Sequence, residues 1–362
     1  MTQNTEVTTK DTKISNETPA KKAGFATIIG KPNVGKSTLM NRLIGQKIAI
    51  TSYKPQTTRT QVRTILTEDR GQIVFLDTPG IHHTKTKMGE FMVKAASSTL
   101  KEVDVVMWLV EPKEKISEED RQILKLLTAI RTPVLILINK IDSVKKAQIL
   151  PVIAVYQHAY DEAFKAQQEL QGKSGGKAQQ ELQGKSGGKD EAAGMKASES
   201  NLKGIIPVSA RSGYGTDDLL RSLFDLLPEG EPFYDEEQVT TETEREIAGE
   251  IIREKALRLL QEEVPHGIAV TIDSMKSRTR KDGTEICDID ASIICERESH
   301  KLIVIGKQGS MLKKIGTAAR TDIENMLQSK VNLKLWVKVR KDWKDNEQQM
   351  KSFGYDMRKY KK

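Results

Sequence analysis

The sequence predicts an α/β fold, with a doubly wound, mostly parallel sheet followed by a smaller α+β domain. Near-continuous apolar runs alternate with segments of helical periodicity, as strands buried on both faces alternate with the helices that cover them. A glycine-rich loop at residues 30–37 joins the first strand to the first helix. Proline and glycine at residues 228–232 separate this series from a second set of helices and strands.

The first domain is expected over residues 23–228, after a polar leader at residues 1–22 that we predict to be disordered and not a signal peptide. A hairpin signal at residues 68–71 separates two of its strands. A helix should begin after Ser117, which is an N-cap residue followed by an acidic first turn. Strands are predicted at residues 25–29, 61–67, 72–76, 104–110, 134–138 and 205–208, and further helices at 38–44 and near 88–101.

One polar segment interrupts this domain. Residues 165–188 are two identical copies of a twelve-residue unit rich in Gln, Lys, Gly and Ser. Such a composition buries too little apolar surface to fold, so we predict a disordered insertion at residues 165–201.

A linker at residues 229–242 leads to the second domain, residues 243–345, and a basic tail, residues 346–362. Cys287 and Cys295 share the apolar face of a predicted strand, which indicates buried side chains in a reducing cytosol. The segment 303–305 is β-branched like a strand, although a helical turn is the alternative. Helices are predicted at 241–263 and near 310–328, and strands at 269–275, 285–296 and 331–340.

Charge is distributed unevenly along the chain. The net charge of the 362 residues is +8, and residues 301–362 hold sixteen Lys and Arg against six Asp and Glu. This asymmetry favours a polyanionic partner, either nucleic acid or an anionic membrane surface. No apolar run approaches the roughly 18 residues that a membrane span needs.

The loop at residues 30–37 fits the phosphate-loop pattern G-x-x-x-x-G-K-[ST]. A strand, a glycine loop and a helix N-terminus in this order direct backbone N–H groups toward a phosphate. Lys36 would reach the β- and γ-phosphates and Ser37 would bind Mg²⁺. Asp77 and Gly80 follow a neighbouring strand, where a carboxylate can hold Mg²⁺ through water and a backbone N–H can meet the γ-phosphate.

Asn139-Lys140-x-Asp142 follows the strand at 134–138 and indicates which base is bound. The Asp142 carboxylate can accept two hydrogen bonds from guanine, whereas adenine offers no such pair of donors. Asn139 would hold the loops together and the stem of Lys140 would cover the ring. Ser209 and Ala210 would place a backbone N–H on the guanine carbonyl.

These elements, in this order and spacing, resemble the translation-factor-related GTPases. Asn33, the segment 54–59 and the pair Gly306 and Gly309 narrow the resemblance to the Era family, within the TrmE-Era-EngA-like group, over residues 22–164 and 202–350. The resemblance implies a GTPase that uses GTP, GDP and Mg²⁺. It implies metal ligation by Ser37, Thr58 and Asp77, catalysis by Lys36, Thr58, Asp77 and Gly80, and nucleotide contacts from Gly30, Lys31, Pro32, Asn33, Val34, Gly35, Lys36, Ser37, Thr38, Asp77, Thr78, Pro79, Gly80, Ile81, Asn139, Lys140, Asp142, Ser209 and Ala210.

The resemblance also implies how hydrolysis is controlled. Thr58, with Thr57 as the alternative, closes over Mg²⁺ and the γ-phosphate in that family. Ile81 stands where many GTPases carry a glutamine that orients water, so we expect slow intrinsic hydrolysis. Family members with an asparagine like Asn33 can be activated by potassium, which makes K⁺ a second candidate ion.

The loop Gly306-Lys307-Gln308-Gly309 resembles that of the type II KH module, whose GxxG loop clamps about four nucleotides of a single strand. Lys307, Gln308, Lys313 and Lys314 would contact RNA together with the two glycines. The module has a helical turn at the position of residues 303–305, and we expect one here despite their β-branched side chains. Trp336 lies among lysines, where it would either stack on a base or pack under a helix.

The resemblance therefore implies a cytoplasmic, monomeric GTP-dependent switch with no DNA partner. It would bind the 3′ end of 16S rRNA through the KH domain and assist 16S rRNA processing and assembly of the small (30S) ribosomal subunit. The alternative is a signalling GTPase that contacts the cytoplasmic face of the cell membrane peripherally, its basic C-terminus binding anionic lipid.

Overall fold

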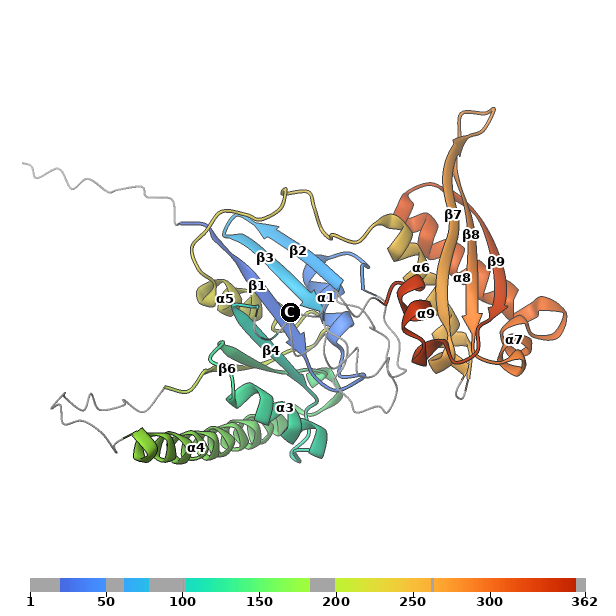
Figure 1. The fold of residues 1–362 in the computed structure, drawn as a ribbon. Helices are drawn as coiled ribbons and strands as arrows, with labels where there is room; N and C mark the ends of the chain where they lie inside the picture. Colours follow the sequence, from blue (N-terminus) through green and yellow to red (C-terminus); the bar gives the residue numbers. More distant parts are fainter. Residues whose placement is uncertain are drawn as a thin grey trace, which may run out of the picture.

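The computed structural model describes residues 20–49, 62–77, 100, 102–182, 199–261 and 264–355. It confirms the predicted fold class, because a six-stranded, mostly parallel sheet precedes a separate three-stranded sheet (Figure 1). The segment 54–59 and most of the helix predicted near 88–101 lie outside the described residues. Within the described part, no helix combines the length and apolarity needed to cross a membrane.

The first sheet has the strand order β2-β3-β1-β4-β5-β6. All neighbouring pairs are parallel except β2 and β3, which form the hairpin expected around Gly71. β4 and β5 are buried along their whole length, as their continuous apolar sequences predict. The strands are β1 (Lys22–Ile29), β2 (Val62–Glu68), β3 (Gly71–Asp77), β4 (Val105–Val110), β5 (Val134–Ile138) and β6 (Leu202–Pro207).

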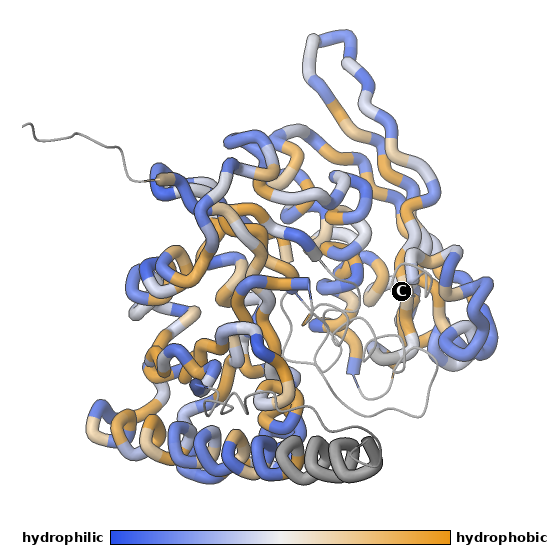
Figure 2. The backbone as a smooth tube through the Cα atoms, turned by 60° about the vertical axis from the view of Figure 1, so that its left-hand side comes forward, coloured by the Kyte–Doolittle hydropathy of each residue, from blue (hydrophilic) through white to orange (hydrophobic). Residues whose placement is uncertain are grey.

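Helices cover both faces of this sheet and form a separate core on each. On one face, α1 (Lys36–Ile44) and α5 (Thr216–Leu226) pack their apolar side chains against the strands. On the other, α3 (Glu118–Thr128) and α4 (Ile149–Leu182) pack around Trp108, Tyr156 and other buried side chains. In Figure 2 the central strands are largely hydrophobic. This arrangement brings the carboxyl ends of the parallel strands to one edge, where α/β proteins bind ligands.

The predicted disordered insertion is wrong for residues 165–182, because α4 continues through them to Leu182. The first copy of the repeat begins with Lys-Ala-Gln-Gln-Glu-Leu-Gln, a run of strong helix formers. This run follows a helix already anchored by the buried side chains of Tyr156 and Tyr160, so extending that helix avoids the cost of nucleation. Residues 183–198 lie outside the described residues.

The predicted linker is packed against the first sheet. Glu229 and Thr240 form isolated bridges with Lys22 of β1 and Thr64 of β2. The buried Gln72 carboxamide accepts hydrogen bonds from the backbone N–H groups of Phe233 (2.8 Å) and Tyr234 (3.0 Å). The connection between the domains therefore follows the β2–β3 edge.

The second sheet has the order β7-β8-β9, with β7 and β8 antiparallel and β8 and β9 parallel. Helices α6, α7 and α8 cover one face, and a shared apolar core includes both cysteines, as predicted. The elements are α6 (Glu244–Leu259), β7 (Ala269–Thr279), β8 (Glu285–Cys295), α7 (Glu298–Ile305), α8 (Ser310–Leu327), β9 (Lys330–Val339) and α9 (Glu347–Ser352).

Two helical segments of this domain differ from what the local sequence pattern predicts. Residues 303–305 are helical, so the resemblance to the KH module predicts this segment correctly where β-branching does not. The helix predicted at 241–263 is shorter at both ends. Thr243 caps it by accepting from the Glu246 N–H, and it ends at Leu259, six residues before Pro265.

Candidate functional site

The phosphate loop leaves β1 at Gly30 and enters α1 at Lys36. Gly30 has φ +152°, and a Cβ there would lie 2.4 Å from the Leu109 carbonyl oxygen. Gly35, with φ +107°, forms the N-cap of α1, and Asn33 also adopts a positive φ of 64°. The loop therefore turns tightly onto a helix N-terminus, whose free N–H groups and dipole suit an anion.

Lys36 is buried inside this loop. Its ammonium donates hydrogen bonds to the carbonyls of Gly30 (3.0 Å) and Lys31 (2.9 Å). Burial lowers the pKa of Lys36 from 10.5 to about 8, although the nearby Asp77 carboxylate opposes this shift. A bound phosphate would supply the negative charge that favours the ammonium, so the geometry fits the predicted role.

Ser37 and Asp77 meet at the mouth of the loop. The Ser37 hydroxyl lies 3.3 Å from the Asp77 Oδ2 atom, and Asp77 is fully buried at the end of β3. Two adjacent oxygen donors fit Mg²⁺, which commonly takes one or two protein oxygens and completes its coordination with phosphates and water. The described residues contain no group of three or more His, Cys, Asp or Glu side chains that could bind a metal without such help.

Asn139 connects the strand ends around the predicted base site. Its side-chain amide donates to the Val34 carbonyl (2.7 Å), and its side-chain oxygen accepts from the Ala210 N–H (2.9 Å). Asn139 is 1% exposed, so both bonds are shielded from water. One carboxamide thus fixes the phosphate loop relative to the loop at Ser209 and Ala210.

Lys140 and Asp142 complete this constellation. The Lys140 ammonium donates to the Asn33 carbonyl (2.7 Å) and to Glu111 Oε1 (2.6 Å). Asp142 Oδ1 accepts from the Ser209 hydroxyl at 2.7 Å. Each of the five predicted base-site residues therefore has a hydrogen bond at this edge of the sheet, and Ser209 orients the Asp142 carboxylate.

Two acidic residues at this site, Asp120 and Glu111, were not predicted. Lys31 donates to Asp120 Oδ2 (2.7 Å) and to the Ser117 hydroxyl (3.0 Å), so the cap of α3 holds the phosphate loop. Glu111, at the end of β4, holds Lys140. The signal for Asp120 was its place in the capping box of Ser117, but nothing in the sequence indicated that Lys31 would be its partner.

The remaining predicted nucleotide-site residues fall into two groups. Pro32, Val34 and Thr38 lie in the loop and first turn as predicted, with Val34 buried. The remaining predictions concern the two loops that would close over the γ-phosphate. Those that lie outside the described residues are Thr57, Thr58, Thr78, Pro79, Gly80 and Ile81.

The second candidate site is the loop between α7 and α8. Gly306 has φ +71°, and a Cβ there would lie 2.8 Å from Met311 Cβ. Gly309, with φ +79°, faces open space, because a Cβ would meet nothing within 4 Å. Gly306 is thus required by packing, whereas Gly309 leaves room for another backbone to approach. Lys307 and Gln308 are exposed between them.

A groove of about 470 Å³ lies between α8 and β9, beside this loop. Gly309 and Lys313, for which we predict RNA contacts, line it, while Lys314 is exposed outside its lining. The other lining residues were not predicted as a site, although those on α8 are three and four residues apart, a spacing that places them on one face of a helix. They are Leu312, Gly316, Thr317, Arg320, Leu333 and Leu335.

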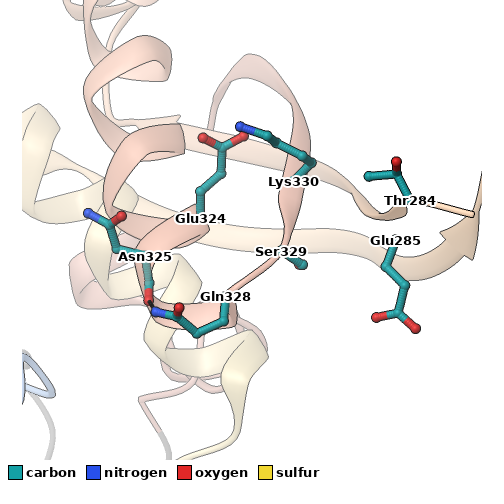
Figure 3. A pocket seen from close by; sticks show the side chains of 7 residues that line it. All are labelled: Thr284, Glu285, Glu324, Asn325, Gln328, Ser329 and Lys330. Atoms are coloured by element: carbon teal, nitrogen blue, oxygen red, sulfur yellow. Dashed lines mark hydrogen bonds between the residues drawn. The ribbon is translucent and has the colours of Figure 1, made fainter.

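A second, polar pocket of about 400 Å³ lies at the opposite end of α8 (Figure 3). Two of its side chains form hydrogen bonds with the backbone at the end of α8 and the start of β9. Glu324 accepts from the Val331 N–H (3.1 Å), and the Gln328 amide donates to the Asn325 carbonyl (2.5 Å). We therefore assign it a structural role and place the candidate RNA site at the groove.

Fold and sites together define a class of protein, a phosphate-loop GTPase joined to a KH domain. A family model described as a 50S ribosome-binding GTPase matches residues 25–140, and a KH-domain model matches residues 263–344. The chain belongs to the Era family of GTPases and is itself a GTPase. It is 45% identical over 335 residues to GTPase Era of Alkaliphilus metalliredigens, covering 92% of this chain and 99% of that one.

Other relatives agree with this assignment. GTPase Era of Ruminiclostridium cellulolyticum is 43% identical over 338 residues, covering 93% and 99% of the two chains. A crystal structure of an Aquifex aeolicus Era variant bound to GDP and AlF₄⁻ matches with a TM-score of 0.77 and 36% identity, covering 92% and 99%. Era in complex with MgGDPNP and nucleotides 1506–1542 of 16S ribosomal RNA matches with the same TM-score and identity, covering 93% and 99%.

Proposed function

We propose that this GTPase binds the single-stranded 3′ end of 16S rRNA and assists rRNA processing and assembly of the 30S subunit, with GTP as the switch. The observation that carries the proposal is the groove beside Gly309. It combines an open backbone approach, the cations Lys313 and Arg320, and the apolar Leu333 and Leu335. Phosphates and bases of a single strand need these two kinds of contact. The complex of an Era protein with 16S rRNA nucleotides supports the choice of RNA.

In this proposal the GTPase domain spans residues 23–228, the linker 229–242, the KH domain 243–345 and the basic tail 346–362. GTP or GDP binds at the phosphate loop with Mg²⁺ held by Ser37 and Asp77, and Thr58 closes over them. Mg²⁺ would neutralise charge on the phosphates, while Lys36 holds the β- and γ-phosphates. Because Ile81 cannot hydrogen-bond a water molecule, intrinsic hydrolysis is slow.

We also propose that potassium activates hydrolysis, with Asn33 as the residue that makes the chain sensitive to it. The Asn33 backbone carbonyl already accepts from the Lys140 ammonium, and Asn33 is exposed in the loop with a φ of 64°. Equal hydrolysis rates in sodium and potassium buffers would remove this part of the proposal without affecting the rest.

The experiment compares two polyanions. The full chain, loaded with a non-hydrolysable GTP analogue, is titrated with a 16S 3′-end oligonucleotide and, separately, with vesicles containing anionic lipid. We expect RNA binding that the double variant Lys307→Asp, Gln308→Asp reduces at least tenfold, with unchanged affinity for GDP as the control. Vesicle binding without RNA binding would instead support the membrane-surface alternative, and RNA binding that survives the double variant would place the RNA site elsewhere.

A further inference from the structure

Trp336 is the one tryptophan that lies at the surface. The sequence contains three tryptophans, and Trp108 and Trp343 are both 0% exposed, whereas Trp336 is 58% exposed. Leaving a large indole in water forgoes the stabilisation that burial provides, so a Trp this exposed indicates a contact surface. The structure thus excludes the interpretation that Trp336 packs under a helix.

The indole lies on the opposite side of β9 from the RNA groove. Successive side chains of a strand alternate between its faces, and Leu333 and Leu335 line the groove. Trp336 therefore belongs to the face that α6, α7 and α8 do not cover, which Figure 1 shows in front of α8. Because β9 is the edge strand of the sheet, groove and indole lie on two sides of one free edge.

The surroundings of Trp336 are polar. Its neighbours in the register are Ser292 and, across β8, Thr271, while Lys334 and Lys338 flank it on β9. Among the nearby acids, Asp273 accepts from Ser292 (2.5 Å) and pairs with Lys338 (3.1 Å), and Asp290 lies beside Lys334 in the register. Asp288 pairs with Arg278 and accepts from the Asn332 amide (2.8 Å).

We propose that Trp336 forms a second RNA subsite, at which a base stacks on the indole after the strand leaves the groove and crosses the edge of β9. A single exposed aromatic ring flanked by lysines is the arrangement that single-stranded nucleic acid uses, by stacking on the ring and pairing phosphates with cations. A protein partner would instead require a cluster of apolar residues around the ring. The apolar residues next to Trp336 on this face are buried, because Trp343, Met350 and Tyr355 cover Ala269 and Ile294, so they offer no exposed apolar cluster to a partner.

This subsite rests on the proposed function and extends it from one face of the KH domain to two. A GxxG groove holds about four nucleotides, so a short RNA would fill the groove alone. A longer strand would reach the indole as well, and the affinity gained by lengthening the RNA would then depend on Trp336.

The buried positions of Trp108 and Trp343 make fluorescence a direct test. The full chain is titrated with an RNA of about four nucleotides and with one of about twelve, three times the length that a groove holds. We expect the longer RNA to quench the exposed tryptophan and protect it from acrylamide, and the shorter RNA to bind without this effect.

Variants separate stacking from folding. Trp336→Ala should weaken binding of the longer RNA about tenfold and leave binding of the shorter one unchanged, while Trp336→Phe should retain most of the affinity. Leu150→Ala, which removes an exposed side chain on α4, is the matched control. If the longer RNA binds with no change in fluorescence and Trp336→Ala binds it normally, the subsite is wrong. If neither RNA binds, the proposed function itself fails.

Discussion

The side-chain amide of Asn139 donates to the backbone carbonyl of Val34 at 2.7 Å, and thereby joins the loop after β5 to the phosphate loop. Its oxygen accepts from the Ala210 N–H. We predict that Asn139→Ala leaves both buried groups unsatisfied, lowers the free energy of unfolding by about 2 kcal/mol and weakens GDP binding at least tenfold. Denaturant titration and calorimetry measure the two effects. Asn332→Ala, at an exposed position in the second domain, should show neither.

Asp142 is expected to select the base. Asp142→Asn replaces a carboxylate, which accepts two hydrogen bonds from guanine, by an amide that pairs with the oxygen of xanthine instead. We predict a change of preference from guanine to xanthine nucleotides, with fold and RNA binding intact. Competition of GDP and XDP for the site measures it, and an unchanged preference for GDP would contradict the assignment of the base site.

Lys36 should make nucleotide binding dependent on pH. Its folded-state pKa of about 8 lies below the unfolded value of 10.5, so the buried ammonium opposes folding below pH 8, and this cost disappears as the pH rises from 8 toward 10.5. A bound phosphate favours the ammonium and raises its pKa again. We predict that GDP binding takes up a proton near pH 8.5 but not at pH 6.5.

Calorimetry in buffers with different ionisation enthalpies measures this uptake directly. The binding enthalpy should vary with the buffer at pH 8.5 and be nearly constant at pH 6.5. Equal proton uptake at both pH values would assign it to a group other than Lys36.

Lys47 provides a link between the two domains. Its ammonium lies 3.2 Å from Glu254 Oε1 on α6 and 2.5 Å from Asp322 Oδ2 on α8, the helix that follows the GxxG loop. These carboxylates raise the pKa of Lys47, although burial opposes the shift. Glu254 also pairs with Arg258 at 2.9 Å.

We predict that Lys47→Met uncouples the domains with little change in stability, because the buried Glu254 keeps its pairs with Arg258 and Lys255, and Asp322 keeps its pair with Lys255. The ratio of RNA affinities with GTP analogue and with GDP should move toward one, while nucleotide affinity stays the same. Arg221→Met, which removes an exposed pair with Asp218 within α5, is the control. A ratio equal to that of the unsubstituted chain would assign coupling to other contacts.

The nucleotide site follows closely from the sequence because its geometry is local. Strand, glycine loop and helix are consecutive, and the parallel sheet brings Asp77, Asn139 and Ser209 to one edge. The acidic partners of Lys31 and Lys140 could not be predicted from the sequence, because each ion pair joins residues separated by 29 positions or more.

Two other differences have physical causes. The composition of the repeat indicated disorder, but an anchored helix runs on into it as far as Leu182. The groove beside Gly309 needs α8 and β9 together, and neither element alone distinguishes groove residues such as Thr317 from solvent-facing ones. The residue pattern of a single helix or strand predicted that element. A surface formed between two elements could be identified only from the structure.

The central claim is that the nucleotide in the first domain controls RNA binding by the second. The most direct measurement is the affinity of the full chain for a 16S 3′-end oligonucleotide with bound GTP analogue and with bound GDP, in the same buffer and salt. The account predicts that the two dissociation constants differ by about fivefold or more, as expected for coupled sites. Equal affinities in the two states would contradict it.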